Sequence, residues 1–182
     1  MRIVVIGTSG AGKTTLARTI ARRLDLVHIE LDALNWQAGW RDLVRSDPTE
    51  FARRVAAAMR VDGWVADGNY AVVRDLLWRN ASHLVWLDYE RPVIMRRVIG
   101  RSLLRLVLRT ELWAGNRERW RFLLQPSHPI LWAWRTWAAL RQATAELIDR
   151  TEYAHLNVLR LRRPGEAQQA VGTLVAATRA ER

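Results

Sequence analysis

Short apolar runs alternate along this chain with longer stretches in which apolar residues recur every three to four positions. An unbroken apolar run is typical of a strand buried on both faces of a sheet, whereas the longer spacing is typical of a helix. The runs that we predict to be strands lie at residues 3–6, 26–31, 64–67, 84–88 and 156–161. Strands that alternate with helices predict an α/β fold, in which helices cover both faces of a parallel sheet.

Four helices are expected between and after these strands. The first follows residue 12, and the second begins after Asp47, a capping residue followed by proline, and runs to about residue 60. The others are expected from Pro92 to about 109 and from 166 to about 180. No repeat or low-complexity linker interrupts the sequence, so we expect one domain over residues 1–182.

The first predicted strand leads directly into the sequence G-T-S-G-A-G-K-T at residues 7–14. Glycines allow the backbone to approach a polyphosphate, the lysine adds a mobile cation, and the threonine hydroxyl suits Mg²⁺. The start of the following helix adds its positive dipole end. The pattern therefore predicts a site for a nucleoside triphosphate with Mg²⁺, whose contacts we assign to Gly7, Thr8, Ser9, Gly10, Ala11, Gly12, Lys13, Thr14 and Thr15.

Composition supports the special role of the lysine. Lys13 is the only lysine among 29 basic residues, in a chain that otherwise uses arginine. A compact ammonium can follow a moving phosphoryl group in a way that a planar guanidinium cannot. The sequence has no cysteine, which excludes disulfides, thiolate metal sites and cysteine nucleophiles.

A formal net charge of +11 attracts anions of several kinds, so nucleotide, nucleic acid and acidic membrane all remain possible on charge alone. The tryptophan- and leucine-rich run at 130–140 contains Arg135 and is too short to span a membrane. The residues before the glycine loop are too few for a signal peptide, so we expect a cytoplasmic protein. The oligomeric state stays open.

Two carboxylates follow predicted strands. Asp32 comes after the second strand and Asp67 ends the third, and ligands of parallel sheets gather at these carboxyl ends. We expect Asp67 to support Mg²⁺ together with Thr14, and Asp32 to lie at a second substrate. A turn residue before Gly68 is the alternative interpretation of Asp67.

Arginines recur every four residues at 97, 101, 105 and 109, and further arginines follow at 117, 119 and 121. Such a row is either a solvated basic face or part of a lid that neutralises a transferring phosphate. We expect a lid-like insertion at about 105–130, in which Arg117 and Arg121 have catalytic roles. The tryptophans of this region are interpreted as core or interface residues, with base stacking or membrane contact as alternatives.

The chain resembles the topology modulation proteins, a branch of the adenylate-kinase-like phosphate-loop kinases. The resemblance rests on G-T-S-G-A-G-K-T-T-L-A at 7–17, L-D-A-L-N-W-Q-A-G-W at 31–40, D-G-N-Y at 67–70 and the V-W-L-D strand ending at Asp88. It implies a three-layer fold with a five-stranded parallel sheet of order 2-3-1-4-5 and a helical lid. It also implies ATP with Mg²⁺, and it places Arg162 beside the adenine.

The resemblance departs from adenylate kinases after Asp67, where Asn69-Tyr70 replaces Phe-Pro-Arg, so AMP is in doubt as the acceptor. Three function classes follow. The first, which we favour, is an ATP-dependent kinase in which Lys13, Asp32, Asp67, Arg117 and Arg121 act on a nucleotide, nucleoside or other small molecule. The second is an ATP-binding regulatory protein that contacts nucleic acid, and the third is an ATPase that drives a conformational switch.

Overall fold

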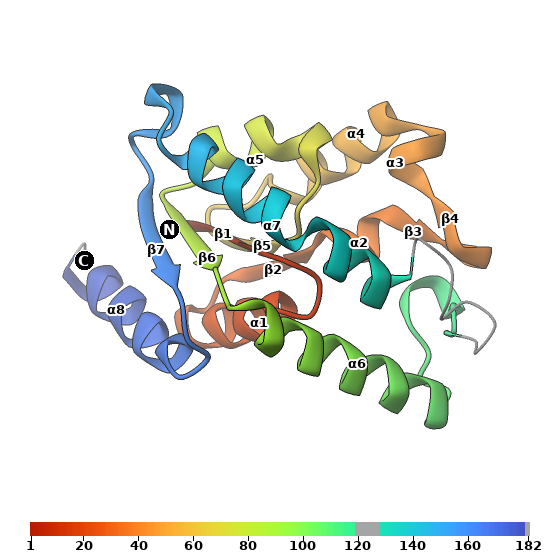
Figure 1. Cartoon of the computed structure of the whole chain (residues 1–182). Coiled ribbons are helices and arrows are strands. Elements are labelled where there is room, and N and C mark those ends of the chain that lie inside the picture. The colour runs from red at the N-terminus through yellow and green to blue at the C-terminus, as the bar shows by residue number, and fades with distance from the viewer. Residues whose placement is uncertain (119–127, 181–182) are drawn as a thin grey trace.

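A five-stranded parallel sheet forms the centre of the computed structural model, which describes residues 1–118 and 128–180 (Figure 1). The strands stand in the order β2-β5-β1-β6-β7, and all four pairings are parallel. Counted along the chain, the order is 2-3-1-4-5, so the expected fold class is confirmed. The strands are β1 (Arg2–Gly7), β2 (Val27–Glu30), β5 (Trp64–Asp67), β6 (His83–Leu87) and β7 (Asn157–Leu161).

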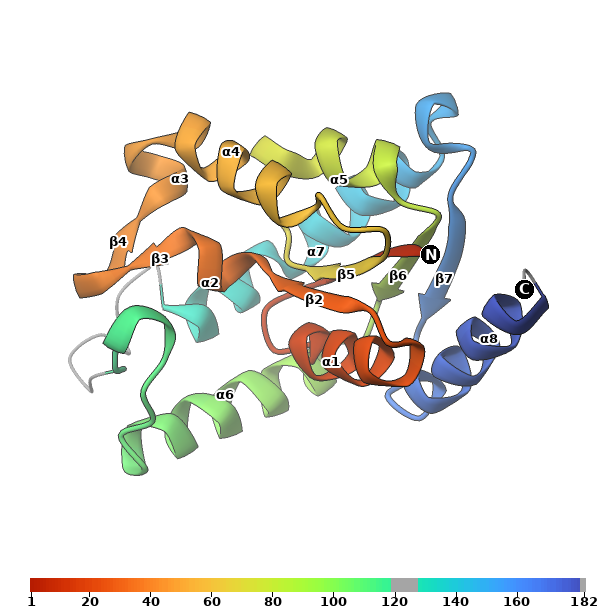
Figure 2. The ribbon, with the colours of Figure 1, turned by 180° about the vertical axis from the view of Figure 1, so that it is seen from behind.

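Helices cover both faces of the sheet, as Figure 2 shows from behind. One face carries α1 (Lys13–Leu24), α6 (Arg91–Val107) and α8 (Glu166–Ala180), and the other carries α4 (Pro48–Ala58) and α5 (Arg74–Asn80). Alternate residues of β1 serve the two cores: Ile3 and Val5 belong to the first, and Val4 and Ile6 to the second. Each strand is therefore buried on both sides, which explains the unbroken apolar runs in the sequence.

The helices expected at 47–60, 92–109 and 166–180 are found within a few residues of those bounds as α4, α6 and α8. The carboxylate of Asp47 accepts a hydrogen bond of 2.9 Å from the backbone N–H of Glu50, so the predicted cap is present.

Residues 32–40, which follow β2, contain short regular elements. They form the helix α2 (Leu31–Asn35), the strand β3 (Trp36–Gln37) and the turn η1 (Ala38–Trp40), and β3 pairs with β4 (Arg41–Asp42) before α3 (Leu43–Ser46). Asn35 is 1% exposed, and its side-chain oxygen accepts a hydrogen bond of 2.8 Å from Val44 N–H. This bond joins the residues on either side of the β3–β4 hairpin. Such a contact leaves no hydrophobic period in the sequence, so the pattern could not predict it.

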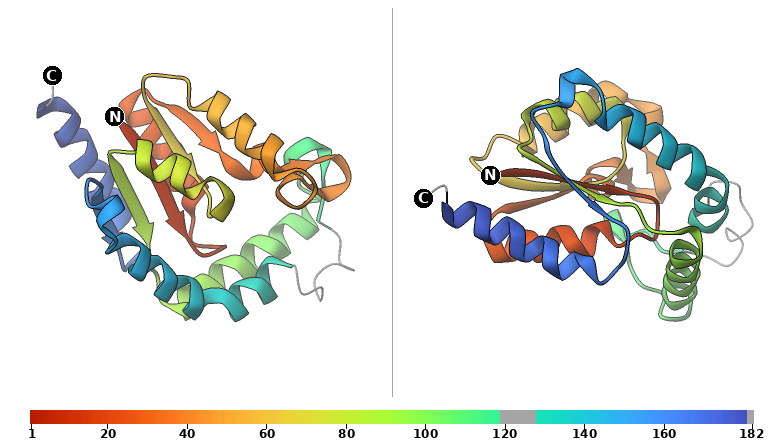
Figure 3. Two further views of the ribbon diagram at one scale, coloured as in Figure 1. Left: turned by 90° about the horizontal axis from the view of Figure 1, so that it is seen from above. Right: turned by 60° about the vertical axis from the view of Figure 1, so that its left-hand side comes forward.

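The twenty-residue helix α7 (Pro129–Ile148) was not expected from the sequence. Its Ala133 packs in the α1/α6 core, whereas Ala145 and Ile148 pack against the α4/α5 core. The helix thus passes along one edge of the sheet and contacts both layers (Figure 3). Its buried positions do not form one stripe, so periodicity could not reveal it. Among the described residues, no helix has the length and apolar character that crossing a bilayer requires.

A buried ion cluster joins the edge of the sheet to α7. Asp88, which follows β6, has a side chain 2% exposed, and each of its carboxylate oxygens lies 2.7 Å from an arginine nitrogen, one of Arg141 on α7 and one of Arg160 on β7. The ion pairs hold three elements that are distant in sequence.

We therefore expect Asp88→Asn to lower the free energy of unfolding by about 2–4 kcal/mol, because it removes the carboxylate partner of Arg160 and leaves Arg141 paired with the exposed Glu90 at 3.5 Å. Chemical denaturation measures this. Glu152→Gln, which removes exposed pairs with Arg79 and Arg150, is the control and should change little. Equal stability of the Asp88 variant and the parent would contradict the role assigned to the cluster.

Candidate active site

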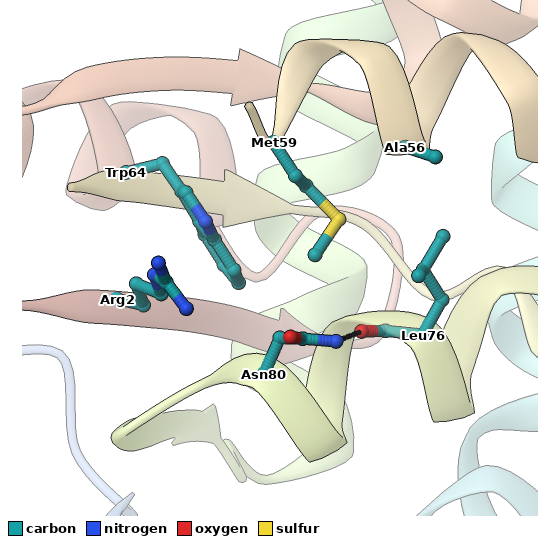
Figure 4. A pocket seen from close by; sticks show the side chains of 6 residues that line it. All are labelled: Arg2, Ala56, Met59, Trp64, Leu76 and Asn80. Atoms are coloured by element: carbon teal, nitrogen blue, oxygen red, sulfur yellow. Dashed lines mark hydrogen bonds between the residues drawn. The ribbon is translucent and has the colours of Figure 1, made fainter. Parts of the chain in front are cut away.

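Two cavities lie at opposite ends of the sheet. The smaller, about 220 Å³, lies at the amino ends of β1 and β5, between α4 and α5 (Figure 4). It is lined by Arg2, Ala56, Met59, Trp64, Leu76 and Asn80. The Asn80 amide already donates to Leu76 O, and no phosphate-loop residue is near. The larger, about 1300 Å³, lies at the carboxyl ends of the strands and includes the glycine loop, where parallel sheets bind ligands.

The glycine loop connects β1 to α1. At two of its positions, Gly7 and Gly10, a larger residue would not fit. Gly7 and Gly10 have φ angles of 148° and 89°. A Cβ atom on Gly10 would lie 2.8 Å from Cβ of Val98 on α6, and one on Gly7 would lie 2.8 Å from Leu87 O. The loop is therefore packed between β6 and α6 as well as curved around a potential phosphate site.

Lys13 begins α1 at the floor of the cleft, and its Nζ donates a hydrogen bond of 3.3 Å to Thr8 O. Burial lowers the pKa of the Lys13 ammonium, and the charges of Asp32 and Asp67 oppose this shift. The positive charge is thus held away from water at a helix N-terminus, where an anion would be favoured.

Two arginines of α6 reach over the loop. Arg97 donates a hydrogen bond of 2.8 Å to Ala11 O, and Arg101 donates one of 3.2 Å to Ser9 Oγ. Burial is the largest cause that lowers the pKa of Arg101, and the neighbouring Arg105 lowers it further. The structure thus places three of the four arginines of the predicted row in the cleft, whereas Arg109 follows the end of α6.

Asp67 lies directly beside the loop, as the sequence predicts. Its Oδ2 accepts a hydrogen bond of 2.7 Å from Thr14 Oγ1, and its Oδ1 lies 2.7 Å from His28 Nε2. His28 was not expected to take part; it lies on β2, which pairs with β5, and only the strand order brings it to Asp67.

The Thr14 hydroxyl and the Asp67 carboxylate fit a Mg²⁺ ion that is bound mainly by phosphates and water. Within residues 1–118 and 128–180, no group of three His, Cys, Asp or Glu side chains could hold a metal alone. A magnesium ion at this position would therefore need the nucleotide as a ligand.

Asp32 lies in α2 and also faces the cleft. Its Oδ1 accepts a hydrogen bond of 2.6 Å from the Tyr70 hydroxyl. Burial raises the pKa of Tyr70 well above its usual value, and the carboxylates of Asp32 and Asp42 raise it further. Tyr70 therefore stays a donor and fixes the position of the Asp32 carboxylate.

The far wall of the cleft is built by the segment that follows α6. Asn116 is 5% exposed; its Oδ1 accepts a hydrogen bond of 2.9 Å from Trp40 N–H, and its Nδ2 donates to Gln37 O at 2.8 Å. Trp113 Nε1 donates to Glu30 Oε1 at 3.0 Å. These bonds close the β3–β4 hairpin against residues 113–117.

Two expected site residues do not line the cleft, and a third is outside the described residues. Arg117 forms an exposed ion pair with Glu111 at 3.2 Å and does not line the cleft. Arg162 is exposed and its backbone N–H donates to Glu166 at 2.7 Å, although the nearby Pro164 lines the cleft. Arg121 lies outside the described residues, as does the centre of the lid-like insertion. The roles assigned to these arginines stay predictions.

The other end of the cleft is largely apolar and offers space for a nucleobase. It is lined by Tyr89, Pro129, Trp132, Pro164, Ala167, Gln168 and Val171. These residues come from four separate parts of the chain, which is why sequence patterns did not identify them.

Comparison with known proteins agrees with this geometry. The protein family described as AAA domain matches residues 3–96. The shikimate kinase of Synechococcus elongatus is 27% identical over 143 residues, which cover 65% of this chain and 72% of that protein. The shikimate kinase of Symbiobacterium thermophilum is 32% identical over 115 residues, with 57% and 66% covered.

Solved structures show the same fold at low identity. A shikimate kinase from Bacteroides thetaiotaomicron has a TM-score of 0.57 at 15% identity, with 98% of each chain covered. A gluconokinase from Sinorhizobium meliloti has a TM-score of 0.51 at 16% identity, with 99% of this chain and 96% of that chain covered. The comparisons support the kinase branch of the phosphate-loop proteins, and the finer resemblance to topology modulation proteins stays a prediction.

The three tyrosines of the chain provide a test of the described geometry. Burial raises the pKa of Tyr70 and of Tyr89, and it raises the pKa of Tyr153, which donates to Asp75 at 2.6 Å, to about 12. We expect a titration of tyrosinate absorbance of the folded protein to show Tyr70 and Tyr153 ionising well above pH 10 and the pKa of Tyr89 displaced upward from 10.0.

Because the folded pKa of Tyr153 lies above the unfolded value of 10.0, the stability that its hydroxyl contributes is complete below pH 10 and is lost as the pH rises through about 12. The folded pKa of Tyr70 is raised further, so its contribution is lost at a higher pH. A tyrosine that ionises near pH 10 in the folded protein would contradict the burial and the Asp32–Tyr70 contact, and Tyr70→Phe would identify the residue responsible.

Proposed function

Since the chain belongs to the AAA domain family, which matches residues 3–96 of 182, we propose that it is a kinase that transfers the γ-phosphate of Mg-ATP to a small-molecule hydroxyl. The observation that carries the proposal is the arrangement of one cleft, with Lys13, Arg97 and Arg101 at the glycine loop and the Asp32 carboxylate facing them. The cations that would stabilise a phosphate therefore lie close to Asp32, which would accept a proton.

The nucleotide end has a distinct part for each residue. The loop and the N-terminus of α1 hold the phosphates, and Lys13 supplies a cation that is stronger in effect because it is desolvated. Thr14 and Asp67 would hold Mg²⁺, which neutralises charge on the phosphates when it is bound. His28 keeps the Asp67 carboxylate in place from the opposite side. Arg97 and Arg101 stabilise the charge that spreads over the transferring group.

At the other end, Asp32 orients the acceptor hydroxyl and takes its proton. The acceptor oxygen forms a bond to the γ-phosphorus while the bond from that phosphorus to the β–γ bridging oxygen breaks, and ADP leaves with that electron pair. Tyr70 holds one oxygen of Asp32, so the other is left to face the acceptor. Catalysis then rests on positioning and charge neutralisation, with no covalent enzyme intermediate.

A nucleic-acid-associated ATPase is the second candidate, favoured by the net charge of +11. Specific duplex binding would lose affinity by about 0.9 in log K per phosphate contact for each unit of log salt, and it would retain a sequence or structural preference. If binding without preference disappears at physiological salt while Mg-ATP binding persists, the second candidate is wrong.

We expect Lys13→Arg to lower turnover by roughly 10²- to 10³-fold, the loss typical of one transition-state charge partner. The wider guanidinium cannot take the same position under the loop. A coupled measurement of ADP release tests this, with the exposed Arg23→Lys as the control for a basic exchange. Normal turnover of Lys13→Arg would show that the loop is not the working phosphate site.

A second experiment should distinguish the roles of Asp67 and Asp32. Asp67→Asn should raise the Mg²⁺ concentration needed for turnover and leave nucleotide binding largely intact. Asp32→Asn should instead keep the magnesium requirement and slow transfer to the acceptor by roughly 10²- to 10⁴-fold, as expected for loss of a general base. Full Mg-ATP turnover in both variants would refute these roles.

A further inference from the structure

The end of the cleft that surrounds Asp32 has its own chemistry. Its wall combines two carboxylates, two indole rings, an amide and a phenol, contributed by Asp32, Trp36, Trp40, Asp42, Asn69 and Tyr70. All of them come from α2, the β3–β4 hairpin and the turn after β5.

Each cation that lines the cleft contacts either the glycine loop or a carboxylate, within the described residues. Arg97 and Arg101 contact the glycine loop, and Lys13 lies at its base. The other two have carboxylate partners: Arg18 pairs with Glu30 at 2.7 Å, and Arg105 pairs with Glu118 at 3.0 Å. In the proposed kinase, the three cations at the loop serve the nucleotide phosphates, so no lining cation of the described residues is left for a negative group on the acceptor.

Within the described residues, the carboxylates at this end have no cation at ion-pair distance, although the charge of Asp32 acts on Lys13 and Arg101. Among residues 1–118 and 128–180, neither Asp32 nor Asp42 forms an ion pair; Asp32 accepts from Tyr70, and Asp42 accepts from the backbone N–H of Arg45. A carboxylate or phosphate on the acceptor would be brought close to two like charges. Hydroxyl groups, in contrast, can donate to these oxygens.

The indole rings are held in fixed positions. Trp36 and Trp40 meet edge to face, with ring centroids 5.5 Å apart and an angle of 78° between planes. Trp40 is fixed further by Asn116 and by its Nε1, which donates to Arg117 O at 3.3 Å. A rigid aromatic surface beside hydrogen-bond acceptors suits a ring that has apolar C–H faces and hydroxyls at its rim.

We propose that the acceptor is a polyhydroxylated compound, a sugar or cyclic polyol, that has no carboxylate or phosphate group of its own. This inference rests on the proposed kinase function and specifies the substrate class of the same site. It sets the chain apart from its relatives named shikimate kinase, because shikimate is a carboxylic acid.

The test is a panel of acceptors assayed for ADP release and for phosphorylated product. One arm contains neutral hexoses, cyclic polyols and amino sugars; the other contains shikimate, gluconate and nucleoside monophosphates. We expect the best compound of the first arm to exceed every compound of the second by at least about 10-fold in kcat/KM, a difference of about 1.4 kcal/mol.

The failures of the two proposals are distinguishable. If an anionic compound is the best acceptor and Lys13→Arg abolishes its turnover, the kinase function stands and the substrate class is wrong. If the protein binds Mg-ATP but phosphorylates neither arm, the kinase function is wrong, and the substrate class is overturned with it.

A variant of the aromatic wall tests the same inference independently. With the best acceptor, Trp36→Ala should raise KM by about 3- to 10-fold with little change in kcat, and Trp36→Phe should restore most of the loss. Trp134→Ala is the matched control, because Trp134 is 53% exposed on α7 and does not line the cleft. An unchanged KM in a folded Trp36→Ala protein would show that the acceptor does not contact this wall.

Discussion

The arrangement of the cleft depends on the free-energy cost of burying the Lys13 ammonium group. Lys13 lies beneath the glycine loop with Arg97 and Arg101 above it, and its burial disfavours the charged form. Asp32 and Asp67 compensate only in part, because the effect of burial on the Lys13 pKa is larger than that of their charges. A bound polyphosphate would complete the balance. The packing of Gly10 against Val98 on α6 serves the same end, because it brings the helix that carries both arginines onto the loop.

The two carboxylates of the cleft differ in what surrounds them, and the difference assigns their parts. Asp67 is 3% exposed, and its two oxygens contact Thr14 and His28. It is therefore suited to orient Thr14 as a metal ligand and is not free to accept a proton from a substrate. Asp32 is bonded by Tyr70 on one oxygen and opens to the cleft on the other. In the proposed mechanism, Asp67 is therefore the rigid support and Asp32 the accessible base, both at the carboxyl ends of the strands.

The sequence predicted the fold and the floor of the site because both depend on local patterns. Buried strands give apolar runs, and the phosphate loop requires its glycines and lysine within eight residues. His28 and Asn116 could not be found in this way, because each meets its partner only through the sheet order or across the cleft, His28 over 39 positions and Asn116 over 76. The helix α7 could not be predicted for a related reason. It packs against both hydrophobic cores, so its apolar residues do not form a single stripe along the helix.

Chemical labelling at Lys13 tests the central claim most directly. An amine-reactive ATP analogue has two kinds of primary amine to react with, the Lys13 side chain and the α-amino group of Met1, and peptide mapping separates them. If the γ-phosphate end of the nucleotide lies against Lys13, one labelled peptide that spans the glycine loop will dominate, and Mg-ATP will protect it. Labelling of that peptide at the same rate with and without Mg-ATP would contradict the account.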